Sequence, residues 1–253
     1  MSYMVARIAV AACLICWSGI VAAQVSGEFH LEKPVYAMGE PIFVYFQVVN
    51  NGLKAERLYS ADPNSDCSAF RIAVSNDAPG PSCARAISCL SSSIVLAPGE
   101  KHVDHILLNL AHKIDLPGEY SVNAEVRSRY LRGSNIMWEP TTLHFKVDQN
   151  AAQREVFQPL RDQLRSGDLL KRIEAARALA SVAPSFLEGT LLAFADDPYI
   201  KKFAPVALHR LNTPKSMAAL AQLRDKTEPG TFEHWQAATY LDHDECADAP
   251  WSN

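Results

Sequence analysis

Residues 42–50, IFVYFQVVN, decide the fold class of the first half of the chain. The stretch is almost entirely β-branched or aromatic, and turn-forming residues stand on both sides, MGEP before it and NNG after it. A run of this composition between turn signals is typical of a β-strand. Apolar residues occupy both the odd-numbered and the even-numbered positions of the run, and so both faces of the expected strand. We therefore expect a central strand with both faces covered.

Further strand patterns follow along the chain. Residues 67–75 alternate, which puts Phe70, Ile72 and Val74 on one face. Residues 91–110 predict a strand, a tight turn at Pro98-Gly99 and a second strand, and the stretches 116–128 and 141–147 continue the series. About seven strands over roughly 125 residues are the pattern of a two-sheet β-sandwich.

Three stretches resemble the immunoglobulin-like domains of secreted bacterial proteins: EKPVYAMGEPIFVYFQVVNNG (32–52), LAPGE (96–100) and LPGEYSVNAEV (116–126). The resemblance covers roughly residues 26–148. Residues 117–122 look like the start of an immunoglobulin strand F, which implies a tyrosine-corner role for Tyr120, with its hydroxyl bonded back to the backbone. Val122 stands where antibody domains place the second bridging cysteine, so the resemblance is one of architecture alone.

After residue 150 the pattern changes to helical spacing. Residues 151–243 are rich in Ala and Leu, and Asp197-Pro198 and Thr213-Pro214 predict helix starts. Pro205 falls in the middle of a predicted helix, where it removes one backbone donor. One apolar stripe contains Ile200, Phe203, Ala204, Ala207, Leu208 and Leu211.

The helical half contains an internal repeat with a shift of 29 residues. The shift places Asp168, Arg172, Ala175, Ala178, Leu179, Leu191 and Asp196 on Asp197, Lys201, Ala204, Ala207, Leu208, Leu220 and Asp225. The pattern resembles the HEAT-like repeat, a pair of antiparallel helices that stacks into a short α-solenoid.

The HEAT-like resemblance implies roles for particular side chains. Asp168 with Arg172, and Asp197 with Lys201, would form a ladder that aligns neighbouring repeats, and a ligand-binding role for these residues is the alternative. Opposite the apolar stripe lies a candidate partner-binding face, for which a merely solvated surface is the alternative. The candidate face consists of Lys171, Glu174, Lys202, His209 and Asn212.

The N-terminus has the pattern of a secretory signal. Arg7 is the only charge before an apolar run from Ile8 to Ala23, which ends in small residues. The run is shorter than the ~20 residues of a spanning helix. We expect cleavage after Ala23 and an exported protein, periplasmic or extracellular. An uncleaved anchor and a lipoprotein attached through Cys16 are the alternatives.

Four cysteines remain after such cleavage, and in an oxidising compartment they are disulfide candidates: Cys67, Cys83, Cys89 and Cys246. Their spacing suits neither a zinc site nor a redox Cys-x-x-Cys. If strands 67–75 and 93–97 form a hairpin, Cys83 with Cys89 is favoured, and Cys67 pairs with Cys246 or stays free. If those strands do not pair, Cys67 with Cys83 or Cys89 is favoured.

Composition and motifs argue against several function classes. The formal net charge of −4 argues against a general nucleic-acid binder. His102 and His105 stand three apart in a predicted strand and so point to opposite faces. No hydrolase elbow, zinc-protease helix or phosphate-binding loop occurs. Residues 242–246, DHDEC, could hold a hard cation or simply form a solvated tail. We expect no enzymatic activity, metal or cofactor, although a triad assembled in space stays open.

The sequence therefore predicts a multi-domain all-β plus all-α protein: a signal peptide (1–23), an immunoglobulin-like β-sandwich (24–148), a linker (149–150), a HEAT-like domain (151–247) and a disordered tail (248–253). The leading hypothesis is an exported, non-catalytic binding or scaffolding protein. It would engage a protein or peptide partner in the cell envelope, without nucleic acid and without stable membrane insertion after cleavage. The alternatives are a proteinase inhibitor that uses the loop 76–91 and an unrecognised hydrolase.

Overall fold

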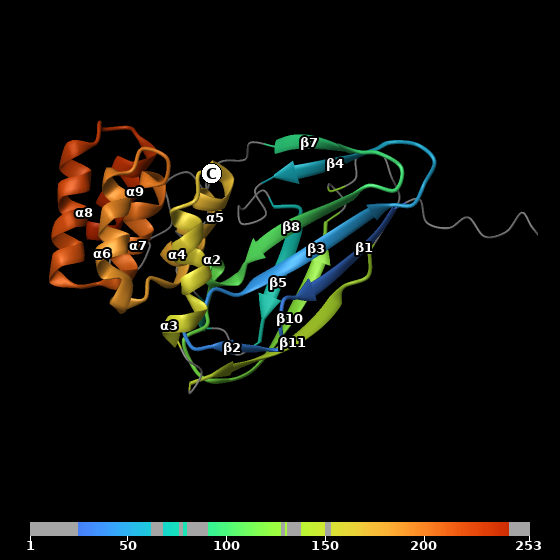
Figure 1. Cartoon of the computed structure of the whole chain (residues 1–253), viewed down its shortest axis with the longest axis horizontal. Helices are drawn as coiled ribbons and strands as arrows, with labels where there is room; N and C mark the ends of the chain where they lie inside the picture. Colours follow the sequence, from blue (N-terminus) through green and yellow to red (C-terminus); the bar gives the residue numbers. More distant parts are fainter. Residues whose placement is uncertain are drawn as a thin grey trace, which may run out of the picture.

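The computed structural model describes residues 25–61, 68–75, 78–79, 91–127, 130, 138–149 and 153–242. Figure 1 shows a β-sheet part joined to a helical part that stands at one end of it. The disulfide candidates Cys67, Cys83, Cys89 and Cys246 lie outside the described residues. The predicted signal peptide and the predicted tail 248–253 also lie outside them.

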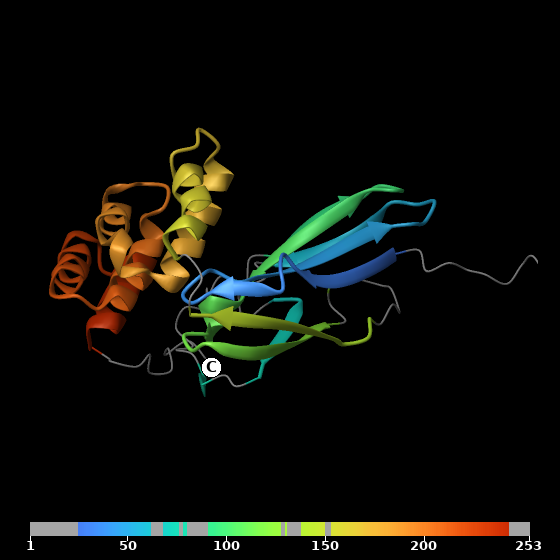
Figure 2. The same cartoon turned by 60° about the horizontal axis from the view of Figure 1, so that its bottom comes forward.

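Two sheets stack as separate layers in the β part (Figure 2). The first is antiparallel, in the order β1-β3-β8, and its strands are β1 (Val25–Leu31), β3 (Phe43–Asn50) and β8 (Lys101–Leu107). The second has the order β2-β11-β10-β5, with β2 (Val35–Ala37) parallel to β11 (Thr141–Asp148), and β10 (Gly118–Val126) antiparallel to β11 and to β5 (Phe70–Val74). The β part is thus a two-layered sandwich.

The sandwich core follows from strand alternation. Val44, Phe46 and Val48 of β3 are buried, and β10 contributes Tyr120 and Val122 from the other sheet. Burying one large apolar side chain contributes about 1.5–3 kcal/mol. The Tyr120 hydroxyl donates to the Leu116 carbonyl oxygen at 2.8 Å, which is the arrangement that the tyrosine-corner hypothesis describes.

The strand partners differ from one sequence prediction. Of the two cases considered for residues 67–75 and 93–97, the hairpin is not formed, because β5 pairs with β10 and β7 (Ser91–Leu96) pairs with β4 (Glu56–Ala61). β4 and β7 form a separate two-stranded sheet. The buried Asn50 at the end of β3 links it to the first sheet, because its side-chain amide donates to the Lys54 and Leu96 carbonyls at 2.8 Å each. The premise that favoured Cys83 with Cys89 therefore does not hold.

A short helical turn replaces the end of the strand expected through residue 110. β8 ends at Leu107, and α2 (Leu108–Ala111) follows. Asn109 accounts for the change, because its side-chain oxygen accepts the Ile42 backbone N–H at 2.7 Å. After α2, β9 (His112–Lys113) pairs with β6 (Ala78–Pro79).

The helical part packs around its own apolar core, which includes Leu179, Phe194 and Leu208. Its α-helices are α3 (Gln153–Val156), α4 (Gln158–Leu164), α5 (Leu169–Val182), α6 (Glu188–Leu192), α7 (Ala204–Leu211), α8 (Pro214–Lys226) and α9 (Phe232–Asp242). Short 3-10 turns at Ser185–Leu187, Ala193–Asp196 and Lys201–Phe203 complete it.

Local geometry in the helical part repeats at the spacing of the sequence repeat. α5 and α7 each end in a left-handed residue, Ala183 at φ 40° and Asn212 at φ 46°, and these two positions are 29 residues apart. The carboxylates of Asp168 and Asp197, also 29 apart, each accept the backbone N–H two residues later, at 3.0 and 2.9 Å. Two successive segments therefore begin and end in the same way.

Pro205 does not lie in mid-helix as the sequence predicted. The segment starts as the 3-10 turn Lys201–Phe203, and α7 begins at Ala204 with Pro205 in its first turn. Proline lacks a backbone N–H and is tolerated in a first turn, where that donor has no intrahelical partner in any case. The proline thus sets the start of α7 instead of kinking it.

The two parts meet where α2 packs on α5, as Figures 1 and 2 show. Arg210 of α7 donates from Nη1 to the Asn109 carbonyl at 2.9 Å and from Nη2 to the Leu110 carbonyl at 3.4 Å. His105 of β8 contacts Glu174 of α5. These polar contacts join the sandwich to the helices.

Candidate functional site

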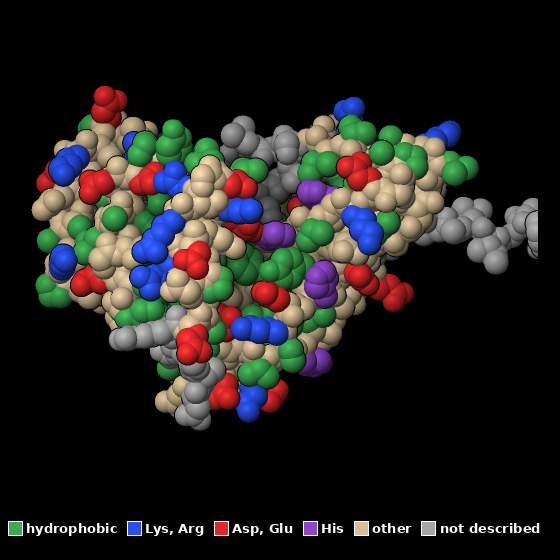
Figure 3. All heavy atoms as spheres, viewed as in Figure 1, with side chains coloured by type: hydrophobic (Ala, Val, Ile, Leu, Met, Phe, Trp, Pro, Cys, Tyr) green, Lys and Arg blue, Asp and Glu red, His purple; other side chains and the backbone are tan. Residues whose placement is uncertain are grey.

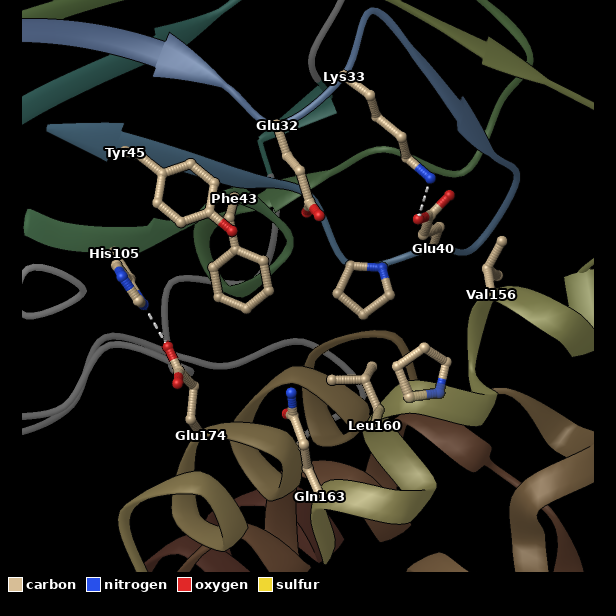
Figure 4. A pocket seen from close by; sticks show the side chains of 12 residues that line it. Glu32, Lys33, Glu40, Phe43, Tyr45, His105, Val156, Leu160, Gln163 and Glu174 are labelled. Carbon is tan, nitrogen blue, oxygen red and sulfur yellow. Dashed lines mark hydrogen bonds and ion pairs between the residues drawn. The ribbon is translucent and has the colours of Figure 1, made fainter.

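A cleft of about 430 Å³ opens between the sandwich and the helices (Figure 4). The sandwich wall is lined by Glu32, Lys33, Glu40, Pro41, Phe43, Tyr45 and His105. The helical wall is lined by Val156, Pro159, Leu160, Gln163 and Glu174. Both parts of the chain are therefore needed to form the cleft.

Strand alternation puts an aromatic cluster on the outer face of the β1-β3-β8 sheet. Because Val44 and Phe46 of β3 point into the core, Phe43 and Tyr45 point outward, and the sheet register sets His105 of β8 opposite Tyr45. The Tyr45 and His105 ring centroids are 5.0 Å apart at 73°, and those of Phe43 and Tyr45 are 6.2 Å apart. The three rings form one wall of the cleft.

The two histidines of β8 lie on opposite faces, as their spacing predicts. His105 faces the cleft, whereas His102 lies on the side of the buried Asp104, with Nε2 to Oδ1 at 3.4 Å. Asp104 also accepts the Tyr130 hydroxyl at 2.6 Å. The Asp104 network belongs to the sandwich interior and not to the cleft.

Charged groups in the cleft are joined in pairs. Lys33 Nζ lies 2.5 Å from Glu40 Oε1, and His105 Nδ1 is hydrogen-bonded to Glu174 Oε1 (Figure 4). The bond to Glu174 raises the pKa of His105, with burial opposing it, and the same bond lowers the pKa of Glu174. Burial, the charges of Glu32 and Glu174, and a hydrogen bond with Glu32 raise the pKa of Tyr45 to about 12.

The cleft carries more negative than positive groups. Three carboxylates line it, against one lysine and one histidine. Glu40 has Lys33 and Glu174 has His105, but Glu32 has no cation within ion-pair distance among the described residues. Figure 3 shows acidic, histidine and hydrophobic side chains meeting in the hollow between the two parts. The site is thus aromatic and acidic.

A second cavity, of about 310 Å³, also lies at the junction of the two parts. Its lining includes Asn109, Lys113, Ser181 and Arg210. Burial lowers the pKa of the Arg210 guanidinium. The Arg210 side chain donates two hydrogen bonds to backbone carbonyls of α2, so its role here is to hold the two parts of the chain together. The larger cleft, with charged and aromatic side chains from both parts, is the stronger candidate site.

The structure does not bring the predicted partner-binding face together. Lys171, Lys202 and Asn212 are exposed, with Asn212 at the left-handed end of α7. Glu174 instead lines the cleft, and the ring of His209 stacks on Tyr240 of α9 at 4.6 Å. A helical wheel considers one helix alone. It could not show that α9 packs on the side of α7 that carries His209, or that the sandwich lies beside the part of α5 that carries Glu174.

The four residues of the predicted ladder lie at equivalent turns. Asp168 caps α5 by accepting the Leu170 and Lys171 backbone N–H groups. Arg172 reaches from α5 to form an ion pair with the Asp197 carboxylate, which belongs to the next segment. The side chain of Lys201 is exposed, and its backbone N–H donates to the Asp197 carbonyl at 2.9 Å. Asp197 is therefore the point where the two segments are joined.

The described residues contain no group of three or more His, Cys, Asp or Glu side chains arranged to hold a metal ion. The acidic stretch 242–246 is described only at Asp242. Within the described ranges, no helix combines the length and the apolar character needed to cross a bilayer.

Sequence reasoning missed the cleft itself. Tyr45, His105 and Glu174 come from three distant segments and lie on both sides of the predicted domain boundary. One signal was available in the sequence: Phe43 and Tyr45 alternate with the core residues of the stretch 42–50 and so lie on its other face. They mark an outer sheet face that something else must cover.

Comparison with known proteins gives no family assignment. No family model matches the chain, and no curated protein matches it. Similar solved structures include a CARDB domain from Pyrococcus furiosus in complex with di-metal ions (14% identity, TM-score 0.28, 49% of this chain and 87% of that chain). They also include a β-glucosidase from Listeria innocua (12% identity, TM-score 0.26, 49% of this chain and 16% of that chain). At such identities and TM-scores the likenesses establish neither a family nor a function.

Proposed function

We propose that this chain is an exported, non-catalytic binding protein that holds a peptide or a protein segment in the cleft between its sandwich and its helical part. The observation that carries the proposal is the cleft, because both parts contribute side chains to it. Concave sites at domain junctions that combine apolar walls with a few placed polar groups are the usual form of binding sites. The signal-like pattern of the N-terminal residues supports export.

The chemistry of the cleft favours binding over catalysis. A carboxyl group acts as a general acid when its pKa is raised toward the working pH. The hydrogen bond from His105 instead lowers the pKa of Glu174. His105 is hydrogen-bonded to the Glu174 carboxylate, and the neighbouring Lys33 forms an ion pair with Glu40.

The architecture supports the same proposal. We interpret α5 to α8 as two HEAT-like helix pairs, because the capping aspartates and the left-handed ends recur after 29 residues. Arg172 and Asp197 would then be the ladder contact between them. We interpret the sandwich as immunoglobulin-like, with Tyr120 as its tyrosine corner. Architecture of this kind supports a binding role only by analogy.

The test uses a substitution that fills the cleft without changing its charge. Random peptides are selected by display on the purified protein, and the affinities of synthetic hits are measured by fluorescence anisotropy. Gln163→Trp places a bulky ring on α4 in the cleft, and Gln222→Trp places the same ring on the exposed surface of α8. We expect the first variant to weaken binding by about tenfold, or ~1.4 kcal/mol, and the second to leave it unchanged.

Two outcomes contradict the proposal. The first is a selection that enriches no peptide above an unrelated protein of the same charge. The second is a set of hits that bind the Gln163→Trp and Gln222→Trp proteins equally well, which places their site outside the cleft.

A further inference from the structure

We infer that the cleft recognises a cationic side chain, the guanidinium of arginine or the ammonium of lysine, presented by a peptide segment. The inference rests on the proposed function and names the chemistry of its ligand. The cation would lie against the rings of Phe43 and Tyr45, with the carboxylates of Glu32 and Glu174 beside it. Figure 4 shows these four side chains around the same opening.

Charge complementarity carries the first step. Glu32 is exposed at the cleft and, among the described residues, no Lys, Arg or His forms an ion pair with it. An anionic ligand would enter beside three carboxylates and meet only one lysine, which Glu40 already holds at 2.5 Å. A cation would instead provide the missing counter-charge.

The aromatic wall carries the second step. A cation over an aromatic face is stabilised by the ring quadrupole, and more so when water is excluded. The protein already uses this arrangement nearby, because Lys33 Nζ lies 5.1 Å from the centre of the Tyr36 ring while it pairs with Glu40. Phe43 and Tyr45, with Glu32 beside them, repeat the combination of ring and carboxylate. The ring of His30 stacks on Tyr45 with centroids 5.3 Å apart, and among the described residues no lysine or arginine lies over either ring, so Phe43 and the other face of Tyr45 are left for the ligand.

The His105–Glu174 bond couples this binding to a proton. Protonated His105 donates its Nδ1–H to a Glu174 oxygen, so that oxygen is occupied. When His105 releases a proton to solvent, Glu174 keeps its negative charge but no longer faces a cation, so that charge is left for the cation of the ligand. Cation binding should therefore release a proton and strengthen as the pH rises through the pKa of His105, which the bond to Glu174 raises above the ordinary value for histidine.

The other charged and titratable groups around His105 come from three elements. Asp104 lies next to it on β8, Tyr45 faces it from β3, and Glu174 and Arg177 belong to α5. Asp104 is buried on the opposite face of β8 and bonded to Tyr130. The phenol of Tyr45 stays neutral in the range considered, because its pKa is raised to about 12. Glu174 is therefore the group that His105 and the ligand share.

The experiment titrates the full protein, labelled for NMR at its histidine and tyrosine rings, with Nα-acetyl-arginine methylamide. Nα-acetyl-citrulline methylamide has the same shape without the charge and is the control probe. We expect the arginine probe to shift the His105 and Tyr45 ring signals with at least about fivefold higher affinity than the citrulline probe. The affinity for the arginine probe should also be higher at pH 8 than at pH 6.

Variants assign the effect to particular carboxylates. Glu32→Gln should lower the affinity for the arginine probe by about threefold or more, and Glu174→Gln should remove its pH dependence. Glu228→Gln changes an exposed carboxylate of the helical part outside the cleft and should do neither. Equal affinities for the two probes, or no shift at Tyr45 and His105 with either, would overturn the inference. A cleft that binds selected peptides irrespective of their basic residues would overturn it too, while leaving the proposed function intact.

Discussion

The His105–Glu174 contact should stabilise the folded protein in a defined range of pH. The bond raises the pKa of His105, so its contribution is fully present below the unfolded value of 6.5 and is lost as the pH rises through the folded value. The bond lowers the pKa of Glu174, so its contribution is present above the unfolded value of 4.5 and is lost as the pH falls through the folded value. The pair should therefore stabilise most between these two values.

The solvent exposure of the two side chains sets the size of the stabilisation. The His105 and Glu174 side chains are 42% and 43% exposed, so solvent screens their attraction. We expect a coupling free energy of about 0.5–1 kcal/mol, near the upper end for exposed pairs, because the geometry is direct. The assay is urea unfolding of the wild type, His105→Gln, Glu174→Gln and the double variant at pH 5.5 and pH 9.

The double-mutant cycle removes every pH effect that does not depend on both side chains. The coupling free energy should reach its full value at pH 5.5 and fall at pH 9, when His105 has lost its proton. A coupling of zero at pH 5.5 would refute the stabilising role of the contact. An equal coupling at both pH values would refute its dependence on the histidine proton, and with it the proton linkage inferred for the cleft.

Four further predictions test the fold and the processing of the chain. Leu179→Ala in the buried helical core should lower the free energy of unfolding by about 2–5 kcal/mol, whereas Leu170→Ala, at a side chain that is 78% exposed, should change it by about 0.5 kcal/mol or less in the same urea titration. Arg210→Met removes two donors from the carbonyls of α2 and should cost about 1–3 kcal/mol in urea unfolding. Tyr120→Phe removes one hydroxyl bond, so calorimetry should show a loss of about 0.5–1.5 kcal/mol. Mass spectrometry of the protein isolated from its native cell should find a chain that begins at Gln24, and a chain that retains the leader would contradict export by cleavage.

Local features of the fold could be predicted from the sequence, because they depend on neighbouring residues. The alternation of β10 predicted its buried face, and Tyr120 and Val122 are indeed buried. The pair Thr213-Pro214 predicted a helix start, and α8 begins there with the Thr213 side chain accepting the Ser216 N–H. In both cases the pattern and the structure involve the same few residues.

Strand partners and the cleft could not be predicted in this way. The alternation of residues 67–75 fixes which side chains point inward but not which strand lies alongside, so the pairing of β5 with β10 was missed. Glu174 was assigned to a surface of the helical part, because nothing in its own helix indicates that His105 lies opposite. Contacts between distant segments depend on how the two parts pack together.

The most direct test of the central claim is to locate a bound peptide on the protein. A peptide selected for binding is synthesised with a benzophenone group, cross-linked by light, and its attachment sites are mapped by mass spectrometry. We predict cross-links on both walls of the cleft, in the segments around Tyr45 of β3 and Leu160 of α4. Cross-links confined to one part of the protein, away from the cleft, would contradict the claim that the junction is the binding site.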